Sequence, residues 1–443
     1  MKRFSISLIS LLLIFSLAAC SNEQKVEEEE EKTETVLDDV SDYTKLDASD
    51  LEVLAYDEDA EAQYRLGVLY EYGIGDVNQD FAKSLEWYTK AAEYDNADAV
   101  NAIGYFYLNG CGVDVDLKLA EEYFSRAAEL GSVNSNVGLG RVILASLSED
   151  EISRIQFLSN QESVKNNDAF DTQVDLDTTT NEKNEKEASE DNKVSLQEID
   201  EQQGIDNIES DEILSDDVLL KKSQQIVEYF RQAEISKDLD GTYYYGYLLE
   251  KGIGIASNPT KAKAFYQNVV AVESDKIEEQ LAINQSNVAL GLLYMKGNGV
   301  VEDQEKAVEC FKAAADNGYA KAQFYIGQCY ENGYGVDKDY EKALENYQLA
   351  ADQSFAPALN QIGYLYYNGY GVDVDFSSAV YYQKLASLQG YAPAEVNLGY
   401  LFENGYGVER NLETALYYYE LAADAGYEGA TEAVVRVRAQ MNE

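Results

Sequence analysis

Apolar residues recur along most of the chain with the spacing of one helix face, and pairs of glycines separate the helical stretches. In residues 320–330 this pattern predicts a helix with one side turned to a core. Gly327 lies inside the stretch; because glycine costs a helix roughly 1 kcal/mol, we expect it to allow close approach of a neighbouring helix. Gly333 and Gly335 predict a helix C-cap and a turn, and Asp339 predicts the N-cap of a second helix.

The same helix–turn–helix unit recurs, with a period of 36 residues over its clearest copies. Eight glycines stand at the equivalent place, the copy at Gly140 being degenerate: Gly67, Gly104, Gly140, Gly246, Gly291, Gly327, Gly363 and Gly399. The N-cap position is repeated at Asp116, Asn258, Asp303, Asp375 and Asn411. A period of this length predicts units that stack to share one core. We therefore predict an all-α fold, an α/α superhelical solenoid of about eight repeats over residues 60–145 and 217–426.

The third unit is interrupted. Residues 132–145 match a first helix, and its second helix appears only at residues 223–234. The stretch 146–216 between them is rich in Asp, Glu, Asn, Ser and Thr, which predicts a disordered acidic insertion. Two interpretations stay open for it: a solvating loop, or an acidic lure for a basic partner or cations. A smaller insertion around residues 269–282 lengthens the connection between the fourth and fifth repeats.

The two ends of the chain differ from the repeats. Residues 1–20 combine a cationic start with an apolar run too short to span a bilayer, which predicts an export signal. Residues 21–59 are acidic and predict a mostly disordered tether, with a first helix against the array expected within 46–59. Residues 427–443 predict one helix that caps the end of the array.

The composition limits the partners and the catalytic groups that the chain could use. There are 34 Lys and Arg against 82 Asp and Glu, a formal net charge of −48, so we expect no nucleic-acid partner. The chain has no histidine, no Ser-x-x-Lys and no Cys-x-x-Cys. Gly-x-Gly recurs, but it joins two helices, which argues against a phosphate loop. We predict no catalytic residues, no cofactor and no metal; a hydrolase using acidic residues is a remote alternative.

Two patterns resemble known families. The string AxAxxxLG…GxGV…KA…YxxAA resembles the Sel-one-like repeat, a relative of the tetratricopeptide repeat, and implies a scaffold or adaptor that binds a protein or peptide. Leu-Ala-Ala before Cys20 is similar to the lipobox of bacterial lipoproteins, which implies acylation of Cys20 and a membrane anchor; the alternative is an ordinary signal peptide. The expected location is the bacterial cell envelope: the periplasmic side of the outer membrane in a host with two membranes, otherwise the cell surface.

The tetratricopeptide resemblance also implies a partner-binding groove. In that family the residue after the helix glycine points into the concave face, which here is Tyr105, Tyr247, Tyr364 and Tyr400. One turn further on the same face stand Glu71, Glu250, Glu331, Tyr367 and Glu403. Tyrosine supplies contact area and acids select basic groups, so we expect a basic or polar peptide. Two alternatives stay open: the tyrosines pack between repeats, or the groove binds a cell-wall polymer or glycan.

Cys310 and Cys329 occupy apolar positions on two helices that we expect to pack together. In an oxidising compartment they could form a disulfide. The alternative is that both are small buried apolar residues.

Overall fold

The computed structural model describes residues 43, 46–165, 214–274 and 276–441. In these residues it consists of 19 α-helices and no strand, which confirms the all-α prediction. Cys20, the tether before residue 43 and residues 166–213 lie outside the described residues.

Sixteen of the helices form eight antiparallel pairs, each a first and a second helix. The first helices are α2 (Ala60–Tyr72), α4 (Ala97–Asn109), α6 (Ser135–Ala145), α9 (Leu239–Lys251), α11 (Ile277–Lys296), α13 (Ala320–Asn332), α15 (Ala356–Asn368) and α17 (Ala392–Asn404). The second helices are α3 (Phe81–Glu93), α5 (Leu117–Glu129), α8 (Asp216–Ile235), α10 (Pro259–Val270), α12 (Gln304–Asp316), α14 (Tyr340–Asp352), α16 (Phe376–Ser387) and α18 (Leu412–Asp424). The remaining three are α1 (Ala48–Tyr56), α7 (Glu149–Lys165) and α19 (Ala430–Met441).

The turn between the two helices of a pair follows the predicted chemistry. Gly333 ends α13 in the left-handed conformation with φ of 77°, and its N–H donates to the carbonyl of Cys329. The carboxylate of Asp339 accepts from the backbone N–H of Lys342 at 3.1 Å, which confirms the N-cap of α14. The same capping bond is present at the other predicted positions: Asp116, Asn258, Asp303, Asp375 and Asn411.

Two glycines of the sixth unit are required by close packing. A Cβ on Gly327 would lie 2.5 Å from the ring of Tyr347 in the second helix, so the helix glycine lets an aromatic ring press onto the helix backbone. Gly335 has φ of 66°, and a Cβ there would lie 2.3 Å from the carbonyl oxygen of Gln304 in the preceding repeat. The first contact therefore joins the two helices of a unit, and the second joins one unit to the unit before it.

The core of seven of the eight units is built around one aromatic ring of the second helix. Seven such rings are no more than 2% exposed: Tyr88, Phe124, Phe230, Tyr266, Phe311, Tyr347 and Tyr419. Burial of one such side chain contributes about 2–3 kcal/mol. Alanines that are 0% exposed surround them, among them Ala314, Ala343 and Ala350, because small residues let neighbouring helices approach closely.

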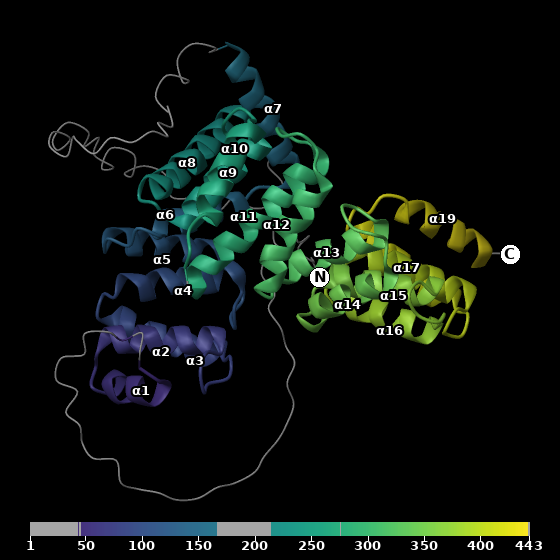
Figure 1. Ribbon diagram of the computed structural model, residues 1–443, viewed down its shortest axis with the longest axis horizontal. Helices are drawn as coiled ribbons and strands as arrows, with labels where there is room; N and C mark the ends of the chain where they lie inside the picture. Colours follow the sequence, from purple (N-terminus) through teal and green to yellow (C-terminus); the bar gives the residue numbers. More distant parts are fainter. Residues whose placement is uncertain (1–42, 44–45, 166–213, 275, 442–443) are drawn as a thin grey trace, which may run out of the picture.

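The pairs stack into a curved array. It runs from α1, turns through α8 to α12 and continues to α19 (Figure 1). First helices of successive units contact one another, α4 with α6, α6 with α9, α9 with α11 and α11 with α13, so they lie on the inner side of the curve. The ends are covered as predicted: α1 packs Leu51 and Ala55 against Leu66, and α19 packs Val434 and Val437 around Tyr419.

The interrupted unit corrects one prediction. Phe230 of α8 lies against Gly140 of α6, as in the other pairs, so the third repeat is complete across the interruption. However, the segment 146–216 is not wholly unstructured, because its first part forms α7. Ile152 and Ile155 of α7 are 8% and 0% exposed and belong to the hydrophobic cluster that contains Phe230. Apolar residues at helical spacing here outweigh the polar composition. The smaller insertion is likewise partly helical, since it lengthens α11 at its start.

Candidate functional site

The four predicted groove carboxylates bond within their own repeats. Each accepts a hydrogen bond from the hydroxyl of the core tyrosine in the second helix. The pairs and their O···O distances are Tyr88 with Glu71, 2.6 Å; Tyr266 with Glu250, 2.9 Å; Tyr347 with Glu331, 2.6 Å; and Tyr419 with Glu403, 2.9 Å. A buried hydroxyl needs a partner, and the glutamate supplies it.

The repeats whose core ring is phenylalanine have no glutamate at the paired position. Phe124 shares a hydrophobic cluster with Leu108, Phe230 with Leu144, and Phe311 with Met295. A tyrosine as the core ring is therefore paired with a glutamate of the first helix, and a phenylalanine is paired with an apolar residue there. We call this correspondence the pair rule.

The ionisation of these groups follows from the bonds. Burial raises the pKa of the Tyr347 hydroxyl, and the Glu331 carboxylate beside it raises it further. Burial would raise the pKa of the Glu403 carboxyl, but hydrogen bonds from Arg436, Tyr419 and Gln440 hold it below its ordinary value. The carboxylates thus have a structural role in the array, and selection of a basic partner by them stays a prediction.

Two of the predicted groove tyrosines are half-buried and lie apart from the others. The ring of Tyr105 meets Phe124 edge to face at 4.8 Å, and the Arg141 guanidinium lies 5.1 Å from its centre. Tyr247 packs against the hydrophobic cluster of α6 and α8, with the Lys251 ammonium 5.7 Å from its ring. Their surroundings match the alternative of packing between repeats.

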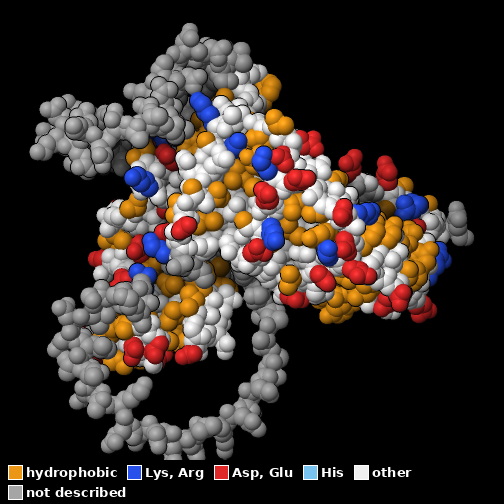
Figure 2. Space-filling view, viewed as in Figure 1, with side chains coloured by type: hydrophobic (Ala, Val, Ile, Leu, Met, Phe, Trp, Pro, Cys, Tyr) orange, Lys and Arg blue, Asp and Glu red, His pale blue; other side chains and the backbone are white. Residues whose placement is uncertain are grey.

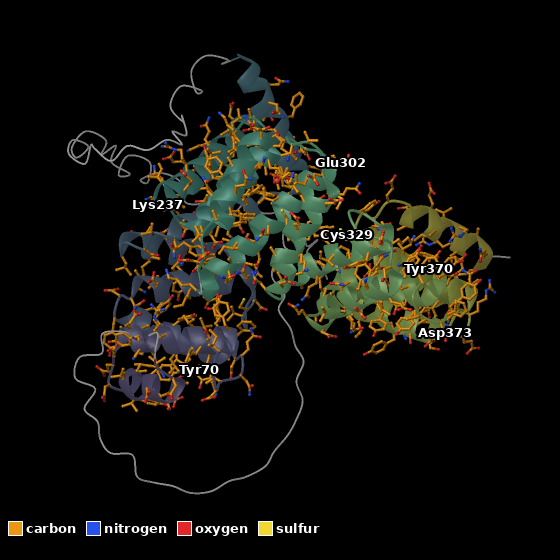
Figure 3. All side chains as sticks on the ribbon, in the orientation of Figure 1. Tyr70, Lys237, Glu302, Cys329, Tyr370 and Asp373 are labelled. Atoms are coloured by element: carbon orange, nitrogen blue, oxygen red, sulfur yellow. The ribbon has the colours of Figure 1, made fainter. Side chains whose placement is uncertain are left out.

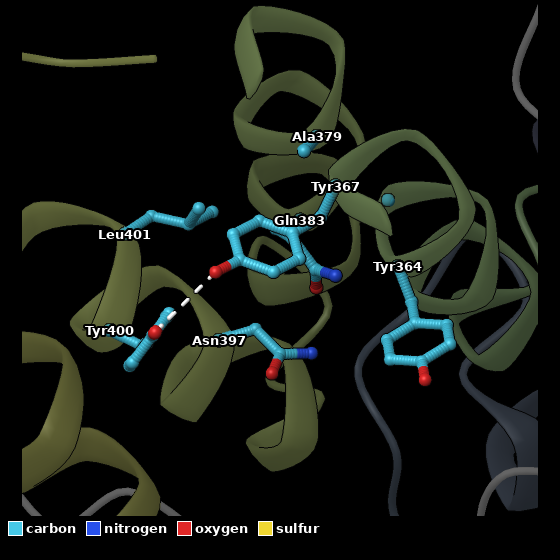
Figure 4. Close-up of a pocket in the computed structure, with 8 residues that line it drawn as sticks. Tyr364, Tyr367, Ala379, Gln383, Asn397, Tyr400 and Leu401 are labelled. Carbon is cyan, nitrogen blue, oxygen red and sulfur yellow. Dashed lines mark hydrogen bonds between the residues drawn. The ribbon is translucent and has the colours of Figure 1, made fainter. Parts of the chain in front are cut away.

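The other three predicted tyrosines line one pocket. Tyr364 and Tyr367 come from α15 and Tyr400 from α17, and they surround a space of about 200 Å³ (Figure 4). Tyr364 and Tyr400 are 41% and 42% exposed. The Tyr367 hydroxyl donates to the Tyr400 hydroxyl at 3.4 Å, and this bond raises the pKa of Tyr367 to about 12. Tyr367 is therefore neutral at physiological pH.

Gln383 of α16 lies at the base of the pocket, where the seven other repeats carry a ring directly over the helix glycine. It is 2% exposed. Its Nε2 donates to the backbone carbonyl of Asn360 at 3.0 Å, and its buried Oε1 has no hydrogen-bond partner among the described residues. Asn397 of α17 lies beside it and donates Nδ2 to Oδ1 of Asn360 at 2.9 Å.

The sequence interpretation missed Gln383 and Asn397. A signal for Gln383 was present, because glutamine replaces the core ring in this repeat alone. The seventh repeat breaks the pair rule at both positions, with Gln383 for the ring and Tyr367 for its partner. No charged residue is among the eight that line the pocket.

Cys310 and Cys329, for which a disulfide and two small apolar residues were the alternatives, are both free thiols in the structure. Although α12 and α13 pack together, the two side chains face different clusters. Cys310 packs with Ala262 and Leu293, and Cys329 packs with Phe311 and Ile326. Cys329 lies near the middle of the array (Figure 3). Burial raises the pKa of Cys310 to about 11 and of Cys329 to about 12, so both stay protonated as small apolar residues.

Within the described ranges, no group of three or more His, Cys, Asp or Glu could hold a metal ion. None of the helices described in the structure has the length and apolar character to cross a bilayer.

The fold defines the class of this protein: an α/α solenoid of helix–turn–helix repeats. The Sel1 repeat family matches seven segments that together make up more than half of the chain: residues 60–94, 97–132, 239–268, 285–319, 320–355, 356–391 and 392–427. The chain therefore belongs to the Sel1 repeat family, whose members are protein-interaction scaffolds. The predicted family is confirmed, and the interrupted third repeat lies between the second and third matched segments.

Similar proteins include a plant protein and bacterial structures. The ERAD-associated E3 ubiquitin-protein ligase component HRD3B of Arabidopsis thaliana is 31% identical over 99 residues, or 21% of this chain and 15% of that protein. The chain thus spans a small part of the length of this relative. A Sel1 repeat protein from Oxalobacter formigenes is 28% identical, with a TM-score of 0.42, over 48% of this chain and 82% of that one. The antigen c5321 of uropathogenic Escherichia coli, with an SLR fold, is 18% identical with a TM-score of 0.25, over 89% and 91% of the two chains.

Proposed function

We propose that this protein is a lipid-anchored scaffold of the bacterial cell envelope that binds a polar or basic segment of another protein along its first helices. The pocket between α15 and α17 is its principal contact. The observation that carries the binding proposal is the gathering of Tyr364, Tyr367 and Tyr400 around one neutral pocket. Exposed tyrosines on rigid helices supply large contact areas at little cost in side-chain entropy.

The surface of the array agrees with a contact in this region. Hydrophobic side chains form a broad area over the C-terminal helices (Figure 2). The net charge of −48 would attract a basic partner during encounter, while the uncharged pocket would determine the close contact. The envelope location and the anchor rest on the lipobox resemblance at Cys20.

The test replaces Tyr364 with a photo-crosslinking phenylalanine derivative in cells and identifies the protein captured. The crosslinked segment is then titrated against the purified wild-type chain and a Tyr364→Ala/Tyr400→Ala variant. We expect a loss of affinity of about tenfold or more, because buried tyrosines at interface centres often contribute over 1.4 kcal/mol.

The matched control is Tyr381→Ala/Tyr417→Ala, which removes two tyrosines of the second helices that are 58% and 51% exposed. This control should bind as the wild type does. Equal affinity of the wild-type chain and the Tyr364/Tyr400 variant would refute the role of the pocket. A parallel titration with purified cell-wall polymer decides the glycan alternative: binding to the polymer without capture of a protein would replace the scaffold proposal.

A further inference from the structure

We infer that the pocket of the seventh repeat binds a neutral side chain ending in a primary amide, an asparagine or glutamine of the bound segment. This inference names the ligand chemistry of the proposed binding site and so rests on the proposed function.

The departure of the seventh repeat from the pair rule creates the pocket. In the sixth and eighth repeats a tyrosine ring covers the helix glycine, at 2.5 Å from a Cβ on Gly327 and 2.7 Å from one on Gly399. In the seventh repeat only the amide of Gln383 lies over Gly363. Gln383 has no ring that could extend along α15. The position that carries the glutamate partner of the ring in the neighbouring repeats is Tyr367 here. The space between these side chains and α17 stays open to the surface.

Gln383, one of the residues that line the pocket, carries an unused acceptor. Oε1 of Gln383 is buried and lacks a hydrogen-bond partner among the described residues, while the other end of the same amide is fixed to Asn360. A buried acceptor without a donor is destabilising, because it has given up its bond to water. A ligand N–H that enters the pocket would supply the missing bond.

The wall of the pocket presents a donor. Because the Tyr367 hydroxyl donates to Tyr400, the proton of the Tyr400 hydroxyl remains available to a ligand. A primary amide carries both groups needed: an N–H for Oε1 of Gln383 and a carbonyl oxygen for Tyr400.

The charge of the pocket selects against ions. A cation would give up its hydration in the pocket, where no lining residue has a carboxylate to replace it. An anion would face the oxygen Oε1 of Gln383 and would be repelled by the strongly acidic chain. A neutral donor loses the least hydration free energy when it enters the pocket.

The experiment titrates the full chain with three small probes by saturation-transfer NMR. Propionamide carries the end group of glutamine, propylammonium is a cation of similar size, and butan-2-one keeps the carbonyl but has no N–H. We expect propionamide to bind about fivefold more tightly than either other probe, the value of about one hydrogen bond.

Variants locate the binding. Gln383→Leu keeps a similar volume and removes the acceptor, so the preference for propionamide should disappear. The double variant Gln383→Tyr/Tyr367→Glu rebuilds the pair of the neighbouring repeats and should abolish binding of all three probes. Gln348→Leu, a glutamine on α14 outside the pocket, is the matched control and should bind as the wild type does.

The inference is overturned if propionamide does not bind, if propylammonium or butan-2-one binds equally well, or if the double variant keeps the preference. The double variant guards against a folding defect in Gln383→Leu, because the same pair is accommodated in four other repeats. These outcomes leave the scaffold proposal standing, since that proposal is decided by the crosslinked segment and the Tyr364/Tyr400 variant.

Discussion

The pair rule makes a quantitative prediction at the sixth repeat. Tyr347→Phe removes the hydroxyl that donates to Glu331 at 2.6 Å, from a side chain that is 0% exposed. A hydrogen bond to a charged acceptor contributes about 1.5–3 kcal/mol. Glu331 keeps the bonds that Gln361 donates at 2.9 Å, so its carboxylate is not left alone. We therefore expect a cost near the lower end, about 2 kcal/mol.

The reciprocal change completes a double-mutant cycle. Glu331→Leu leaves the Tyr347 hydroxyl buried without its acceptor and should also cost about 2 kcal/mol. The double variant Tyr347→Phe/Glu331→Leu reproduces the phenylalanine–leucine pair of the second and third repeats. It should cost about as much as either single change and much less than their sum, a coupling of about 1–2 kcal/mol.

The measurement is native-state hydrogen exchange of peptides from α13 and α14, because a repeat array opens locally and a single global unfolding energy would average over all units. Tyr381→Phe, which changes a tyrosine that is 58% exposed, is the control and should alter exchange little. Strict additivity of the two single changes, or a Tyr347→Phe cost no larger than that of the control, would refute the pair rule.

Three further predictions concern the pocket, the C-terminal cap and the anchor. Gln383→Tyr/Tyr367→Glu should slow hydrogen exchange in α15 and α16 by stabilising them by about 1 kcal/mol, since it removes an unpartnered buried acceptor; faster exchange would contradict this. Arg436→Met should lower stability by about 1 kcal/mol at neutral pH. Because the folded pKa of Glu403 is lowered, its contribution is present above the unfolded pKa and is lost as the pH falls through the folded value. The stability difference from wild type should thus shrink in urea titrations below about pH 4; a difference independent of pH would argue against it. Cys20→Ser should abolish incorporation of an alkyne-tagged palmitate and move the protein out of the membrane fraction; unchanged labelling would exclude acylation at this residue.

The repeating parts of the fold could be predicted from the sequence because each has a local cause. Gly333 and Asp339 determine a turn and a cap through their own backbone and side-chain chemistry, and Gly327 signals a close approach that the ring of Tyr347 makes. The pair rule was equally readable, since the glutamate precedes its tyrosine by 16 or 17 residues in all four pairs.

The remaining features depend on packing that composition conceals. Ile152 and Ile155 stand in a segment dominated by polar residues, so the helix α7 was missed. Cys310 and Cys329 face different clusters, and this depends on how α12 and α13 are each rotated about their own axes. The pocket arises because the ring expected at Gln383 is missing, and an absence is visible only against the rule that the other repeats obey.

The location of the paired residues bears on how such an array can change in evolution. The helix glycine, the core ring and its glutamate or apolar partner all belong to one repeat unit. One contact with the preceding unit is made by Gly335 against backbone atoms, which are the same whatever the neighbouring side chains are. A unit can therefore be duplicated, deleted or exchanged as a cassette without separating a matched pair. Gene duplication could lengthen the scaffold one repeat at a time, and each new copy would be free to lose its ring and acquire a pocket of its own.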